Sequence, residues 1–205
     1  MEEGSPVANW QRVLLQDEIL AAIIRSQPEI EQLPHEDIYI SLLSSIISQQ
    51  LSTKVARVIK TRFYNLFPEN YPQPVLVLAQ PDEVLRSVGL SFQKLGYIRN
   101  VASFAEAGNL QYDIIANLAD EELIKHLTQI KGVGRWTAEM ILMFTLTRPD
   151  VFPVDDLGIQ NAIKKHYAIT ESGKALKAEM IKIAEAWRPY RTLASRYLWQ
   201  SLDNA

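Results

Sequence analysis

The sequence predicts an all-α protein, and three observations support this fold class. Apolar residues recur at helical spacing through most of the 205 residues, as at Ile19, Ile23 and Ile24. Proline and glycine interrupt these stripes at short intervals, which is typical of helix ends. No segment between turn signals keeps the alternation of apolar and polar residues that a half-buried strand requires. We therefore expect about ten helices and no sheet.

The first six helices follow from apolar stripes and their breaks. Pro28 and Pro34 separate a stripe at residues 17–26 from one at 35–50, where Leu42 and Ile46 share a face. Pro68 ends the next stripe, and further prolines and glycines divide the middle of the chain. The expected ranges are 17–26, 35–50, 52–67, 74–79, 82–88 and 91–107.

The last four helices lie around two informative loops. Leu123 and Leu127 place a helix at 120–130, and Ala138 and Leu142 place another at 135–146. After a loop rich in proline, the remaining ranges are 156–167 and 173–203, the last broken at Pro189.

Composition limits the classes of protein and site. A hydrophobic fraction of 47% and a charged fraction of 22% are ordinary for a globular protein. Because the chain has no cysteine, disulfides, thiolate zinc sites and cysteine-held clusters are excluded. The net charge of −3 is concentrated in residues 1–37, whose eight acidic and two basic residues leave +3 on the rest. We expect an intracellular monomer with no secretory signal and no membrane partner.

The most specific segment is a hairpin at residues 120–144. Acids open its first helix, which suits the positive end of a helix dipole, and Lys131-Gly-Val-Gly134 precedes the second helix. Two glycines allow a tight turn and the close approach of another molecule. The N–H groups that begin the second helix would then face an anion such as a DNA phosphate. Taken alone, Gly-x-Gly favours a plain helical hairpin.

As a whole, this segment resembles the helix–hairpin–helix element of the DNA glycosylase superfamily. The resemblance implies that the hairpin binds DNA phosphates at Gly132, Gly134, Arg135 and Thr137. It also implies a structural cation, monovalent or divalent, on the backbone carbonyls of Thr128, Ile130 and Val133. No cofactor is expected for catalysis. Contacts through backbone N–H groups would let a chain of negative net charge hold duplex DNA, since charges beyond about 8 Å are screened.

Two acids follow the hairpin where the helix at 156–167 begins. Asp155 and Asp156 could both be explained as helix caps, but only one of two neighbours can be the cap, and the other faces elsewhere. The superfamily carries an essential aspartate at this point, and its pattern selects Asp156, leaving Asp155 as the more structural neighbour. An ionised Asp156 could stabilise the oxocarbenium character of the sugar, position the attacking water, or both.

Trp136 is a departure from the superfamily members that have lyase activity. Those members place a lysine at or near this position to form a Schiff base. Here no lysine lies between Lys131 and Lys164. The resemblance therefore implies a monofunctional enzyme that leaves an abasic site uncut.

The aromatic residues of this chain resemble those of the 3-methyladenine DNA glycosylase II (AlkA-like) branch, which uses an electron-rich pocket for the base. The match places Trp136 and Trp199 in the pocket, with Met140 and Leu157 where the branch can have aromatics. A cationic alkylated purine gains about 0.5–2 kcal/mol of cation–π attraction on an indole. The alternative for any tryptophan at helical spacing is the core, and we expect it for Trp10 and Trp187.

The segment Gln49-Gln50-Leu51 also resembles this branch, where a residue fills the gap left by the flipped base. We expect Leu51 to be this wedge, with Gln50 beside it, although a core leucine in a polar turn is nearly as good an explanation. The histidines lack metal-ligand spacing. Basic residues are expected mainly on solvated faces, with a subset on phosphate; they are Lys54, Arg57, Lys60, Lys94, Arg188, Arg191 and Arg196.

The resemblance covers about residues 35–203 and implies a single glycosylase domain over 1–205. One lobe would span about 35–145 and the other about 1–34 plus 146–205, with the active site in the cleft between them. The expected function is release of alkylated purines, such as 3-methyladenine, from duplex DNA in base excision repair. Two alternatives stay open, a glycosylase for a neutral lesion such as uracil or hypoxanthine and a non-catalytic DNA-binding module.

Overall fold

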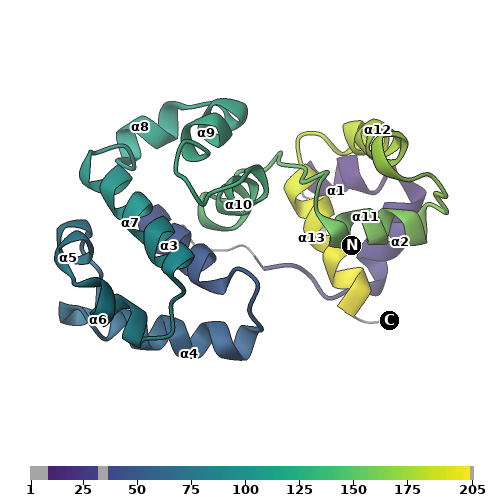
Figure 1. Ribbon diagram of the computed structural model, residues 1–205. Helices are drawn as coiled ribbons and strands as arrows, with labels where there is room; N and C mark the ends of the chain where they lie inside the picture. Colours follow the sequence, from purple (N-terminus) through teal and green to yellow (C-terminus); the bar gives the residue numbers. More distant parts are fainter. Residues whose placement is uncertain (1–8, 32–36, 204–205) are drawn as a thin grey trace, which may run out of the picture. The chain divides into compact units, whose positions relative to one another are not determined.

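All regular secondary structure in residues 9–31 and 37–203, the ranges that this computed structural model describes, is helical, and these ranges contain no strand. The all-α prediction is confirmed. The chain forms two compact units, with unit 1 made of residues 1–34 and 147–205 and unit 2 of residues 35–146 (Figure 1). In the described ranges, no helix has the length and apolar character needed to cross a bilayer.

Unit 2 is built around α3 (Ile38–Ser48), which packs against α4 (Thr53–Tyr64) and α7 (Phe92–Glu106). Asp37 starts α3, because its Oδ1 accepts the backbone N–H of Tyr39 at 2.8 Å. One wide face of α3 is buried and mostly apolar, and the half-buried stripe opposite it is made of serines and Ile40. The short helices α5 (Pro74–Ala79) and α6 (Asp82–Ser87) cover α7, and the 3₁₀ turn η1 (Pro68–Asn70) precedes them.

The hairpin of unit 2 consists of α9 (Asp120–Leu127) and α10 (Arg135–Met140). The sequence predicts one helix over 135–146, but α10 passes at Ile141 into a π-helical turn, η2 (Ile141–Thr145). Such turns carry an extra residue per turn and often occur at functional sites. α8 (Tyr112–Asn117) was not expected, since its six residues bury only Ile115 and carry no helical stripe.

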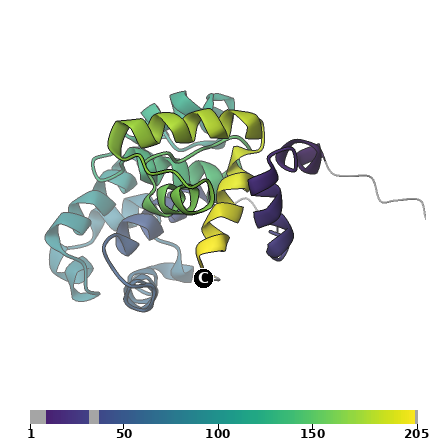
Figure 2. The same cartoon turned by 90° about the vertical axis from the view of Figure 1, so that its right-hand side faces the viewer.

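Unit 1 contains α1 (Asn9–Leu14), α2 (Glu18–Ser26), α11 (Leu157–His166), α12 (Gly173–Ala184), η3 (Glu185–Trp187) and α13 (Arg191–Asp203). α1 is a further short helix that the sequence did not predict. Figure 2 shows α1 and α2 (purple) beside α13 (yellow), and α13 also packs on α11. The predicted break at Pro189 is confirmed, because η3 ends at Trp187 and α13 begins at Arg191.

Asp17 joins three parts of unit 1 through one carboxylate. Its Oδ1 accepts the N–H groups of Ile19 and Leu20 at the start of α2. Its Oδ2 accepts the Tyr167 hydroxyl at 2.7 Å and the Trp187 indole N–H at 2.9 Å. Trp187 is fully buried, as expected of a core tryptophan. Burial, followed by the hydrogen bond to Asp17, raises the pKa of Tyr167 well above its usual range.

Replacement Asp17→Ala should lower the free energy of unfolding by about 2–4 kcal/mol, because it removes a helix cap and leaves two buried donors without their acceptor. Urea denaturation followed by circular dichroism measures the change. Glu18→Gln, at an exposed neighbouring carboxylate, is the matched control and should shift the free energy by less than about 0.5 kcal/mol. Equal effects of the two replacements would contradict the role assigned to Asp17.

Candidate active site

Asp156 lies at the first turn of α11 and is held there by two hydrogen bonds. Its Oδ1 accepts the backbone N–H of Ile159 at 2.9 Å, which makes Asp156 the N-cap of the helix. The same oxygen accepts the indole N–H of Trp199, in α13, at 2.8 Å. Both donors, and the N-terminal end of the helix dipole, direct partial positive charge at this oxygen. The side chain is half-buried, so it is anchored at the surface of unit 1.

Gly158 allows this close arrangement. A methyl group on Gly158 would lie 2.9 Å from Trp199 Cδ1 and 3.0 Å from Asp156 Oδ1, which is tighter than carbon atoms tolerate. The indole therefore lies directly against the backbone of α11. Trp199 is half-buried. The sequence placed it in a base pocket and gave no sign that its N–H bonds to the carboxylate.

The two residues flanking Asp156 have different surroundings. Asp155, expected to be the structural neighbour, is exposed and pairs with Lys177 of α12 instead of capping α11. The cap and the predicted catalytic carboxylate are thus the same residue. Leu157, predicted for the base pocket, is 74% exposed at the start of α11.

The two hairpin glycines serve different purposes. Gly132 has φ +109°, and a methyl group there would lie 2.3 Å from Tyr97 Cγ of α7, so both the turn and the packing require glycine. Gly134 has an ordinary φ of −90°, and no atom lies within 4 Å of the position its Cβ would take. Its side of the hairpin is open to another molecule.

Side chains from distant parts of unit 2 hold the hairpin turn. Gln49, which follows α3, donates from Nε2 to the Gly132 carbonyl at 3.1 Å, and Asn100 of α7 donates to the Lys131 carbonyl at 3.1 Å. Lys94 Nζ donates to the carbonyls of Ile47 and Gln49 at 2.9 and 2.6 Å. This lysine, expected on a solvated face, is half-buried, and burial lowers its pKa. The end of α3 and the hairpin turn are therefore fixed to one another.

Arg135 is engaged within the protein. Its guanidinium bonds to both carboxylate oxygens of Glu121 in α9 and, through Nε at 2.9 Å, to the buried Glu139. Thr137 is buried, with only 5% of its surface exposed. Its backbone is therefore the part that could contact a phosphate. Thr128, Ile130 and Val133 are the residues predicted to hold a structural cation. The Ile130 carbonyl accepts the Val133 N–H at 2.9 Å, and Thr128 is the C-cap of α9.

A cavity of about 500 Å³ in unit 2 contains two of the predicted pocket residues, Trp136 and Met140. We call it the Trp136 cavity. Phe144 extends its apolar side, because positions 136, 140 and 144 are four residues apart and lie on one face of the helix. The opposite side is polar and comes from α3 and the turn after it; it is lined by Ser44, Ser45, Ser48, Gln49 and Gln50. Trp136 is 47% exposed, so its indole is accessible.

The two predicted wedge residues, Gln50 and Leu51, differ in their relation to this cavity. Gln50 is exposed and has φ +58°, a left-handed conformation that costs a residue other than glycine about 1–3 kcal/mol. Leu51 is half-buried and follows it, with its N–H bonded to the Ser48 carbonyl at 3.1 Å. Gln50 lines the Trp136 cavity, and Leu51 does not.

The sequence analysis missed several residues of these sites. The α3 serines and Phe144 line the Trp136 cavity, and Lys94 and Asn100 brace the hairpin. The serine stripe at positions 41, 44, 45 and 48 was a visible signal, because helices of this apolar character seldom present so many small polar residues to their neighbours. In unit 1, Arg188 and Arg191 both pair with Asp150; Arg188 is exposed as expected, whereas Arg191 is half-buried.

Known proteins match this chain both in sequence and in fold. Residues 43–189 match the sequence profile described as HhH-GPD superfamily base excision DNA repair protein. A Bacillus subtilis relative named putative DNA-3-methyladenine glycosylase YfjP is 34% identical over 172 residues, which are 81% of this chain and 59% of that protein. The chain therefore spans little more than half the length of that relative.

Two solved structures are similar over nearly the whole chain. The Bacillus halodurans DNA-3-methyladenine glycosidase has a TM-score of 0.85 and 37% identity, over 96% of this chain and 90% of that one. The Schizosaccharomyces pombe 3-methyladenine DNA glycosylase, solved in complex with abasic DNA, has a TM-score of 0.81 and 32% identity, over 94% and 95%.

The two glycines should respond differently to alanine. Gly132→Ala should lower the free energy of unfolding by about 2–4 kcal/mol, through a strained backbone and a clash with Tyr97. Gly134→Ala should cost less than about 1 kcal/mol, since the added methyl group meets nothing. Urea denaturation of both variants measures this difference, and similar losses would contradict the distinction.

Proposed function

The chain belongs to the HhH-GPD superfamily of base excision DNA repair proteins, and we propose that it is a monofunctional DNA glycosylase for alkylated purines such as 3-methyladenine. It would flip the damaged nucleotide out of duplex DNA and hydrolyse the bond between base and deoxyribose. The observation that carries this proposal is the Asp156 carboxylate, anchored by the first turn of α11 and by the Trp199 indole. The names of the similar glycosylases from Bacillus and Schizosaccharomyces support the class of substrate.

Asp156 would act on the sugar. As the N-glycosidic bond breaks, its electron pair leaves with the base and positive charge develops at C1′ and the ring oxygen. A carboxylate held negative stabilises this charge, and it can accept a proton from the water that then adds to C1′. Because two donors fix Oδ1, the carboxylate needs little reorganisation when the charge appears.

The Trp136 cavity would hold the base. Alkylated purines that carry a positive charge gain cation–π attraction on the accessible indole of Trp136, and the thioether of Met140 adds a soft, polarisable contact. The hydroxyls of Ser44, Ser45 and Ser48 offer hydrogen bonds to the edge of the base, but their position in this cavity does not select one lesion. A base whose glycosidic bond is already weakened by alkylation does not require a strong general acid.

DNA would be held by the hairpin. The open side of Gly134 lets a phosphate approach the amides around residues 132–137, and Arg135, fixed by Glu121 and Glu139, would contribute charge without changing its position. Gln50 and Leu51 would enter the duplex. The carbonyls of Thr128, Ile130 and Val133 belong to one tight turn and are the hard oxygen ligands that a structural cation prefers, with Ile130 able to use its second lone pair. We expect the protein to act as a monomer.

The strand should stay intact after base release. Trp136 occupies the position where lyase-active members of the superfamily have a lysine, and the nearest lysines in the sequence are Lys131 and Lys164. Without a lysine at this position, no Schiff base is expected to form with the abasic sugar. Borohydride should therefore trap no covalent complex, and alkali should be needed to cut the product strand. A trapped complex would show that the chain has lyase activity.

Replacement Asp156→Asn tests the proposal directly. It should reduce the single-turnover rate of base release from methylated duplex DNA by at least about 100-fold, because the amide keeps the shape and loses the charge. Chromatography of the released bases measures this rate. Asp155→Asn is the matched control and should retain the rate within about threefold, since Asp155 only pairs with Lys177 at the surface. Unchanged release by Asp156→Asn would contradict the role of this carboxylate.

A panel of methylated, deaminated and oxidised duplexes identifies the substrate class. Release of 3-methyladenine with no release of uracil or hypoxanthine is the expected result. Preferential release of a neutral base would assign the enzyme to deaminated lesions, and no release from any duplex would indicate a non-catalytic DNA-binding module.

A further inference from the structure

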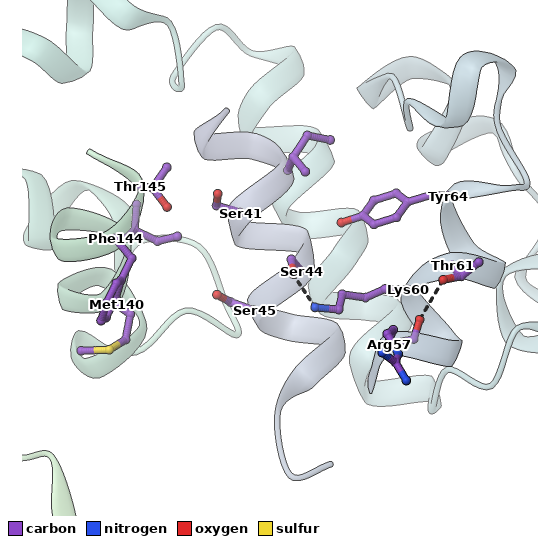
Figure 3. Close-up of a pocket in the computed structure, with 12 residues that line it drawn as sticks. Ser41, Ser44, Ser45, Arg57, Lys60, Thr61, Tyr64, Met140, Phe144 and Thr145 are labelled. Atoms are coloured by element: carbon purple, nitrogen blue, oxygen red, sulfur yellow. Dashed lines mark hydrogen bonds between the residues drawn. The ribbon is translucent and has the colours of Figure 1, made fainter. Parts of the chain in front are cut away.

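A second cavity of unit 2, of about 500 Å³, lies on α3, and its wall with Arg57, Lys60 and Tyr64 has no part in the proposed reaction. We call it the Lys60 cavity. Figure 3 shows Ser41, Ser44 and Ser45 of α3 between two walls. One wall is the α4 face that carries Lys60 and Tyr64, and the other is the helix end that carries Met140 and Phe144. The small α3 side chains create the hollow.

The Lys60 cavity is cationic. Arg57 and Lys60 line it, and none of its lining residues is acidic. Asp37, the nearby carboxylate at the start of α3, is occupied by the N–H groups of its own helix and by the Tyr71 hydroxyl at 2.8 Å. Two positive charges one helical turn apart, with no acid in the same cavity, favour an anion as the occupant.

Hydrogen-bond donors surround these charges. Lys60 Nζ donates to Ser44 Oγ at 3.1 Å, which holds the ammonium group on the floor of the cavity. The hydroxyl oxygen of Tyr64 is buried and lies beside the Ser44 hydroxyl, with which it interacts. Burial raises the pKa of Tyr64 to about 12, so the hydroxyl keeps its proton at neutral pH. An anionic occupant would offer this proton a charged acceptor, which makes a stronger hydrogen bond than a neutral hydroxyl does.

We propose that the Lys60 cavity binds a phosphate ester, with Lys60 and Arg57 as counter-ions and the Tyr64 and Ser44 hydroxyls as further contacts. A phosphate group offers several acceptor oxygens to this set of donors. The cavity is larger than a phosphate alone, and its apolar wall at Met140 and Phe144 suits a sugar or base attached to the group. The phosphate could belong to the DNA strand or to a free mononucleotide.

The Lys60 cavity adjoins the Trp136 cavity, since both are lined by Ser44, Ser45, Met140 and Phe144. An occupant of one therefore lies beside an occupant of the other. The proposal does not depend on Asp156, which belongs to unit 1. Loss of base release and loss of phosphate binding are thus separate results.

Four variants of the full chain test the site. Lys60→Gln and Arg57→Gln remove one charge each, and Tyr64→Phe removes only the buried hydroxyl. Arg62→Gln, an exposed arginine of the same helix outside the cavity, is the matched control. Thermal unfolding of each variant checks that the fold is retained, and Tyr64→Phe keeps the test valid if a charge variant does not fold.

Two measurements distinguish the sources of the phosphate. If it belongs to DNA, Lys60→Gln and Arg57→Gln should each reduce the slope of log affinity against log salt by about 0.9 for duplex DNA, while Arg62→Gln leaves it unchanged. If it belongs to a free nucleotide, titration calorimetry should show dAMP binding that weakens at least tenfold in Lys60→Gln and severalfold in Tyr64→Phe, with inorganic phosphate as the comparison ligand. Unchanged salt slopes together with no binding of dAMP or phosphate would overturn the proposal.

Discussion

The hydrogen bond from the Trp199 indole to Asp156 Oδ1 joins two helices of unit 1 at the point where its chemistry is expected. The same oxygen caps α11, so the carboxylate cannot rotate without giving up a helix cap and leaving an indole N–H unpaired. Gly158 makes the contact possible, because any side chain there would push the indole away. Support of the carboxylate and the requirement for glycine at 158 follow from this one contact, which adds to the apolar core that α11 and α13 share.

Unit 2 uses the same kind of support at its hairpin. The turn at Gly132 is held by an amide from the end of α3, and the end of α3 is held by the Lys94 ammonium group. The cavity that contains Trp136 lies between these braced elements, with Phe144 and Met140 on its apolar side. A site assembled from side chains of several helices needs such supports, since each helix alone has little to fix it.

Much of the fold could be predicted from local pattern, and the site only in part. Helical stripes, Pro189 and the glycines of the hairpin are local signals, and the all-α fold follows from them. The resemblance pointed to Asp156, Trp136 and Trp199, but no pattern distinguishes a tryptophan that stacks from one that donates to a carboxylate. Lys94 looked like a surface lysine because its acceptors lie 45 and 47 residues away. The cap at Asp156 was assigned to its neighbour for a similar reason, since the Lys177 that pairs with Asp155 is distant in sequence.

A double-mutant cycle between Asp156 and Trp199 tests the central claim most directly. If the indole acts by holding the ionised carboxylate, Trp199→Phe, which keeps an aromatic face, should slow single-turnover base release about tenfold in the wild-type background. In the Asp156→Asn background the same replacement should change the residual rate less than twofold, because there is no longer a charge to hold. An equal slowing in both backgrounds would show that the two residues act independently and would contradict this account.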